Sequence, residues 1–207
     1  MIKSLKHTLR SPAHQMVMLL AVTCIALQYA GLSDQLRFDR SRIDSGQWWL
    51  LLSGNFVHLG LGHLWMNLAG LALVVALVWN HFTASQWLFV ILLSSASVGV
   101  GLWIFNPYIS FYVGFSGVLH GLILAGTLAD LRVYPRSATT LLVLVVGKLA
   151  WEQTAGALPG SESMAGGRVE VDSHFYGAIV GAVVGLGIII LRWIKRHRTA
   201  KHTSRSS

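Results

Sequence analysis

Three apolar stretches of the chain carry polar side chains that together could carry out acyl transfer. One contains His58, His63 and Asn67, a second contains Ser116, and a third begins at His174. A serine hydroxyl becomes a strong nucleophile only when a base removes its proton. A neutral imidazole, with a pKa of about 6.5, suits that exchange around neutral pH. The residue types therefore predict a serine nucleophile activated by a histidine.

The composition indicates that these side chains lie inside a membrane. Of the 207 residues, 54% are hydrophobic and only 12% are charged, a balance that a water-soluble domain of this size could hardly cover with polar surface. A membrane-spanning helix needs about 20 mostly apolar residues. The sequence predicts an all-α, polytopic membrane protein, a bundle of six transmembrane helices near residues 14–32, 56–79, 86–105, 115–133, 138–156 and 174–194.

The formal net charge of +8 is concentrated near the ends of the chain. By the positive-inside rule, both termini are predicted to be cytoplasmic. The chain then divides into a basic N-terminus (1–13), a six-helix membrane domain (14–194) and a basic tail (195–207). We expect the tail to bind anionic lipid rather than nucleic acid, because aromatic residues do not alternate with its basic ones.

The first apolar stretch has an alternative interpretation. Its basic start and the apolar run from Met16 to Leu27 are also typical of a secretory signal peptide. No suitable small-x-small cleavage site follows, so we expect a retained helix; cleavage would leave five spans in the same orientation. The single cysteine, Cys24, lies in this stretch and excludes both a disulfide framework and a cysteine metal site.

Orientation places the polar side chains at one depth. With cytoplasmic termini, the second, fourth and sixth helices all begin on the non-cytoplasmic side. Polar residues near their starts then share the outer leaflet, and polar groups within a membrane usually face the bundle interior and serve function. The residues concerned are His58, His63, Asn67, Ser116, His120 and His174.

Small residues at every fourth position predict which helices are neighbours. Such spacing places them on one helix face, where two backbones can approach closely. Packing of the two faces would bring His174 to Ser116. The same faces could instead only pack helices, for example in a dimer. The residues are Gly177, Gly181 and Gly185 in the sixth helix, and Gly117, Gly121, Ala125 and Ala129 in the fourth.

Two histidines compete for the role of base. His120 follows Ser116 by four residues, and its side chain leans back toward the hydroxyl. His174 approaches from a separate helix and could face a substrate carbonyl. The spacing alone leaves this choice open.

The oxyanion formed by attack on a carbonyl must be met by preorganised donors. The Asn67 amide, the His63 imidazole and the backbone N–H of Ser116 are suitable, and His63 and Asn67 project from one helix face. For His58 we expect a structural hydrogen bond.

The ordered set of motifs resembles the rhomboid family of intramembrane serine proteases, and the resemblance extends over nearly the whole chain. It implies a Ser116–His174 dyad without a catalytic aspartate, an oxyanion hole of His63, Asn67 and the Ser116 amide, and no cofactor or metal. The motifs are H-x4-H-x3-N at His58, His63 and Asn67, G-x-S-G from Gly114 to Gly117, and H-x2-G-x3-G at His174, Gly177 and Gly181, with His120 as a further supporting residue.

The first loop and the Val118-Leu119-His120 sequence resemble the bacterial rhombosortase branch of that family. This resemblance implies substrates held by a carboxyl-terminal transmembrane anchor with a Gly-Gly motif. It also implies a bacterial inner-membrane location, with the active site toward the periplasm. The chain departs from many rhomboids in having Leu50 after Trp49 in place of an arginine that braces the first loop, and His120 in place of an aromatic residue.

Two other functions compete with proteolysis. Several histidines at one depth could bind zinc, but the chain has no H-E-x-x-H motif, and we expect no carboxylate beside the cluster. A non-catalytic relative could bind and escort membrane helices. Lys148 and Glu152, one turn apart, are predicted to form a structural ion pair; they could instead contact substrate or favour movement of the fifth helix.

Overall fold

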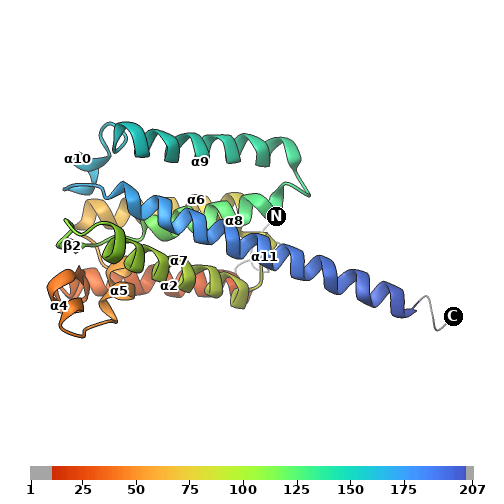
Figure 1. The fold of residues 1–207 in the computed structure, drawn as a ribbon, viewed down its shortest axis with the longest axis horizontal. Coiled ribbons are helices and arrows are strands. Elements are labelled where there is room, and N and C mark those ends of the chain that lie inside the picture. Colours follow the sequence, from red (N-terminus) through yellow and green to blue (C-terminus); the bar gives the residue numbers. More distant parts are fainter. Residues whose placement is uncertain (1–10, 204–207) are drawn as a thin grey trace, which may run out of the picture.

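The computed structural model describes residues 11–203 and is dominated by six long helices that run side by side (Figure 1). Most of the short elements gather at one end of the bundle, where the helices that start at Ser116 and Val171 begin, whereas the turn at Trp79–His81 lies at the other end, beside Asp130. The long helices are α2 (Pro12–Tyr29), α6 (Leu61–Val78), α7 (Ala84–Phe105), α8 (Ser116–Asp130), α9 (Pro135–Ala155) and α11 (Val171–Thr203). The short elements are α3 (Ser33–Leu36), α4 (Arg40–Asp44), α5 (Leu50–Ser53), η1 (Gly54–Phe56), η2 (Trp79–His81), α10 (Ser161–Ala165), and β1 (Phe38–Asp39) paired antiparallel with β2 (Phe111–Tyr112).

Within the described residues, four helices are long and apolar enough to cross a membrane: α2, α6, α7 and α11. Helix α8 is apolar but has only 15 residues, which span about 22 Å of a hydrocarbon layer about 30 Å thick. Helix α9 has 21 residues but carries several polar and charged side chains, including Lys148 and Glu152. The structure therefore supports four membrane-crossing helices by this criterion, fewer than the predicted six.

Local signals explain where the helices begin. The side chain of Ser11 accepts a hydrogen bond from the backbone of His14 at the start of α2, and Pro12 and Pro135 occupy first-turn positions of α2 and α9. Thr83 and Gln86 form a reciprocal capping box at the start of α7. These ends differ from the predicted ones by a few residues, as expected where hydropathy alone sets the boundary.

The predicted contact between the small-residue faces of α8 and α11 is observed. A Cβ added at Gly177 would overlap the backbone of Gly117, and one added at Gly181 would overlap the backbone of Gly121. Further along, a Cβ at Gly185 would lie 2.7 Å from the Cα of Ala125. Only residues without side chains allow this approach, so the glycines fix the register that places the start of α11 against the start of α8.

The first loop is braced by Arg40 through contacts that the sequence does not predict. Its guanidinium donates to the carbonyls of Leu102, Trp103, Asn106 and Ile109 at distances of 2.8–3.0 Å. These carbonyls lie at and just beyond the carboxyl end of α7, where helix carbonyls lack intrahelical partners and carry partial negative charge. Arg40 thus ties the loop to α7 without the Trp-Arg pair of many rhomboids.

Replacing Arg40 by alanine is expected to lower the free energy of unfolding by roughly 2–4 kcal/mol, because four charge-assisted hydrogen bonds are lost at once. Thermal unfolding of the purified protein in detergent would measure the loss. Arg37→Ala is the matched control, since Arg37 pairs with Asp34 at the surface and should contribute less than about 1 kcal/mol. Equal melting temperatures for the two variants would contradict the bracing role.

His58 lies outside the helix that the sequence predicts for it. Helix α6 begins only at Leu61, after an extended Val57 and an unwound segment. The basic N-terminal segment 1–13 and the tail 195–207 lie partly outside the described residues. Lys3, Lys6, Arg10 and Arg205 lie outside the described residues.

Candidate functional site

Ser116 and His174 meet at the end of the bundle where α8 and α11 begin. Ser116 is the first residue of α8, and His174 lies in the first turn of α11. Nε2 of His174 lies 2.9 Å from Oγ of Ser116, a distance at which the hydroxyl can donate to the imidazole. His174 is buried, with 4% of its surface exposed. Its own ring can therefore be held in one orientation toward the hydroxyl.

Gly117 explains why the two helix starts can come so close. A Cβ at this position would lie 2.7 Å from the carbonyl oxygen of Ser173, the residue before His174. The glycine on the far side of Ser116, Gly114, has a φ of +128°, a conformation that only glycine adopts readily. Gly117 therefore allows the starts of α8 and α11 to approach each other, and Gly114 allows the backbone to turn before it enters α8.

Two side-chain donors lie beside Gly114. A Cβ added there would lie 2.7 Å from Nε2 of His63 and 3.9 Å from Nδ2 of Asn67. The backbone N–H of Leu59 donates to Nδ1 of His63 at 3.5 Å, which leaves Nε2 as the protonated nitrogen of the neutral ring. Nδ2 of Asn67 is buried and has no partner among the described residues. An unpaired buried donor is costly unless a ligand satisfies it.

These groups line one cavity of about 670 Å³, together with Ser116, His120, Glu152 and His174. The N–H groups of the first helical turn have no intrahelical partners, so the Ser116 amide at the start of α8 is a third available donor. The site therefore combines a hydroxyl, an imidazole in contact with it, and a cluster of donors.

His120 occupies a different position from the one its spacing favoured. Its Nδ1 lies 2.7 Å from the backbone carbonyl of Ser116 rather than at the hydroxyl, so Nδ1 donates. Its ring stacks on that of His174, with centroids 4.3 Å apart and planes at 21°. The ring thus supports His174 as an aromatic side chain would, while its contact with Ser116 is through the main chain.

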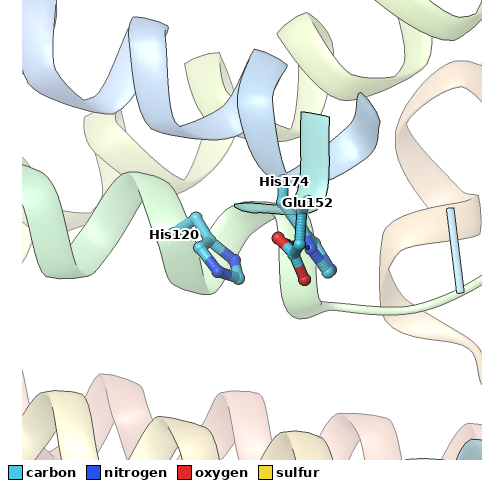
Figure 2. Close-up of side chains that lie close together, drawn as sticks. All are labelled: His120, Glu152 and His174. Carbon is cyan, nitrogen blue, oxygen red and sulfur yellow. Dashed lines mark hydrogen bonds and ion pairs between the residues drawn. The ribbon is translucent and has the colours of Figure 1, made fainter. Parts of the chain in front are cut away.

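Glu152 and Lys148, from α9, belong to the same cluster. Oε2 of Glu152 lies 2.9 Å from Nδ1 of His174, and Figure 2 shows the carboxylate beside that ring, with His120 next to it. The expectation that no carboxylate lies beside the histidines was wrong. The spacing of Lys148 and Glu152 predicted only an ion pair between them, with no contact to the histidines. Alternation of the helices already placed the carboxyl end of the fifth helix at the depth of Ser116, which could have indicated the contact.

Within the described residues, His120, Glu152 and His174 form the one group whose ligand atoms could hold a metal ion, all within 4.8 Å of one another. Two of these residues already accept hydrogen bonds from the Lys148 ammonium, His120 through Nε2 at 3.0 Å and Glu152 through Oε1 at 2.6 Å. A positive charge at this point opposes a cation. The donor set therefore suits hydrogen bonding better than metal binding.

His58 lies behind His63, with ring centroids 5.1 Å apart in an edge-on arrangement. Burial, and secondarily the neighbouring His63, lowers the pKa of His58 to about 3, so the ring is neutral at physiological pH. The predicted structural hydrogen bond is not found, because neither ring nitrogen has a partner in the part of the chain that the structure describes. His58 therefore contributes packing against His63.

Comparison with known proteins places the chain in a family. Residues 45–191, more than half of the chain, match the Rhomboid domain family. The chain is also 26% identical over 111 residues to the Rhomboid protease GluP of Bacillus subtilis (strain 168). That alignment covers 52% of this chain and 22% of the relative, so the chain matches only a part of it. The chain belongs to the rhomboid family and is a multi-pass membrane protein.

Proposed function

We propose that this protein is a rhomboid-type intramembrane serine endopeptidase, in which Ser116 is the nucleophile and His174 the base. The observation that carries the proposal is the 2.9 Å contact between Ser116 Oγ and His174 Nε2, in a cavity that Asn67 and His63 also line. The name of the relative GluP supports the same reaction class.

In the proposed reaction, Nε2 of His174 takes the hydroxyl proton as Ser116 Oγ bonds to the scissile carbonyl carbon. The carbonyl oxygen becomes an oxyanion that accepts hydrogen bonds from Asn67, His63 and the Ser116 amide. His174 then returns the proton to the leaving amine. Water, deprotonated by the same imidazole, hydrolyses the acyl-enzyme and regenerates the serine.

We propose that the chain crosses a bacterial inner membrane six times, with both termini cytoplasmic and the site toward the periplasm. The concentration of basic residues at the chain ends supports this orientation. In this arrangement the short α8 starts below the outer surface, which places Ser116 inside the membrane but within reach of water.

The proposed substrates are membrane-anchored proteins, cut near a carboxyl-terminal transmembrane anchor that contains a Gly-Gly motif, as the resemblance to rhombosortases implies. A scissile bond must leave the helical conformation to reach Ser116. Glycine lowers the cost of that unwinding because it weakens a helix by about 0.5–1 kcal/mol relative to alanine. The cavity of about 670 Å³ is large enough for several unwound residues.

Co-reconstitution in liposomes with a substrate bearing such an anchor tests the proposal. We expect one cut near the Gly-Gly pair and much slower cleavage when the pair is replaced by Leu-Leu. A protein that binds the anchor helix without forming product would instead be an escort. Activity that is lost on chelation and unaffected by serine-directed phosphonates would indicate a metal-dependent enzyme.

Replacing Asn67 by alanine is expected to lower kcat by roughly 10²–10³-fold with little change in KM, because an oxyanion donor acts mainly in the transition state. The liposome assay would measure both constants. Asn80→Ala removes the same amide group from an exposed position beyond α6 and should leave kcat unchanged. Equal kcat values for the two variants would remove Asn67 from the oxyanion hole.

A further inference from the structure

Helix α9 presents two ionisable side chains to the site while most of its apolar residues face outward. Val143, Leu144 and Trp151 are exposed, whereas Glu152 has only 3% of its surface exposed. Burying an ionised carboxylate is expensive unless charged partners and hydrogen bonds compensate for lost water. The contacts of Glu152 must therefore offset the cost of burying its carboxylate.

Both carboxylate oxygens of Glu152 have a partner. Oε1 lies 2.6 Å from Nζ of Lys148, and Oε2 lies 2.9 Å from Nδ1 of His174. An ionised carboxylate only accepts hydrogen bonds, so Nδ1 of His174 carries a proton and donates it. The other ring nitrogen, Nε2, is then the acceptor that faces the Ser116 hydroxyl. The contact with Glu152 thus selects the tautomer that can act as a base.

Lys148 links Glu152 to His120. Its Nζ donates to Nε2 of His120 at 3.0 Å as well as to Glu152. Nδ1 of His120 donates to the Ser116 carbonyl, so each ring has one donor and one acceptor nitrogen and every contact is satisfied. The stacked rings of His120 and His174 are therefore held by hydrogen bonds from α8 and α9 together.

We propose that Glu152 is a positioning residue that completes a Ser116–His174–Glu152 triad, with Lys148 holding the carboxylate in place. This inference rests on the proposed function. The proton moves from Ser116 Oγ to His174 Nε2 and back to the leaving amine, while Glu152 stays ionised. The carboxylate orients the ring and stabilises the positive charge that the imidazole acquires, as the acid does in Ser-His-Asp enzymes. The dyad implied by the family resemblance thus gains a third member in this chain.

The test measures the reactivity of Ser116 apart from substrate binding. The full-length protein in detergent is labelled with a fluorophosphonate, and its kcat and KM are measured in the liposome assay. We expect Glu152→Gln to lower the labelling rate and kcat by about 10²–10⁴-fold, with KM nearly unchanged. Glu152→Asp keeps the charge on a side chain that is shorter by one methylene, and this variant should be labelled at an intermediate rate.

Asp130→Asn is the matched control. Asp130 is another buried carboxylate, 2.8 Å from Nε2 of His81, at the opposite end of α8 and about 20 Å from Ser116 along the helix axis. Its replacement should lower the melting temperature but leave the labelling rate per folded molecule within about threefold of wild type. A purely structural Glu152 would behave in the same way.

The outcomes separate this inference from the function on which it rests. A folded Glu152→Gln protein that labels and turns over within about threefold of wild type would overturn the triad while leaving the protease intact. If that variant does not fold, a wild-type rate in folded Glu152→Asp would overturn it. A wild-type protein that neither labels at Ser116 nor cleaves would overturn the proposed function, and the triad with it.

Discussion

Replacing Ser116 by alanine is expected to lower the rate of cleavage by about 10⁴–10⁶-fold, the loss seen when a serine hydrolase loses its nucleophile. His174→Ala should cause a loss of similar size, because the hydroxyl is then left without a base. The two residues act as one unit. The double variant should therefore be no slower than either single variant, and kcat in the liposome assay would measure all three.

Ser97→Ala is the control for this series. The Ser97 hydroxyl donates to the carbonyl of Tyr176 at 2.7 Å, between α7 and α11, so its loss removes one interhelical hydrogen bond worth about 1 kcal/mol. Cleavage should stay within severalfold of wild type. A Ser116→Ala protein that retains a tenth of wild-type activity would contradict the serine mechanism.

Replacing Gly181 by leucine is expected to destabilise the protein by about 3 kcal/mol or more, because the new Cβ would overlap the backbone of Gly121, which cannot move aside as a flexible side chain could. Separation of α8 from α11 would also pull His174 away from Ser116. Cleavage should therefore fall even at temperatures where the variant remains folded. Thermal unfolding and kcat would be measured on the same preparations.

Gly187 offers a control in the same helix. A Cβ added at Gly187 meets nothing within 4 Å, and replacement of a helical glycine by leucine generally favours the helix by several tenths of a kcal/mol. Gly187→Leu should therefore be neutral or slightly stabilising. Equal melting temperatures for Gly181→Leu and Gly187→Leu would mean that the small-residue contact does not hold the two helices together.

The helix pairing could be predicted from sequence because it depends on residue size at regular spacing. Glycine at 177, 181 and 185 favours close packing of two helices, and this packing does not depend on the conformation of the surrounding loops. That contact brings together the starts of α8 and α11, so the proximity of Ser116 and His174 followed from it. The local spacing of His120 was a weaker guide, because a side chain four residues later can reach the serine carbonyl instead of the hydroxyl.

The contacts that the sequence did not reveal come from parts of the chain without a comparable pattern. The face that α9 turns toward α8 is set by tertiary packing, so the spacing of Lys148 and Glu152 indicated a mutual pair but not the rings that they contact. Arg40 lies 62 residues or more from the carbonyls that it binds, and no periodicity links them. His58 was assigned to a helix because hydropathy does not detect the unwound segment before α6.

The most direct measurement is the site of covalent modification by a fluorophosphonate, mapped by mass spectrometry on the intact chain and on its fragments. A single adduct on Ser116, formed by wild type and lost in His174→Ala at unchanged melting temperature, is the predicted result. An adduct on another residue, or cleavage that continues after Ser116 is fully modified, would contradict the account.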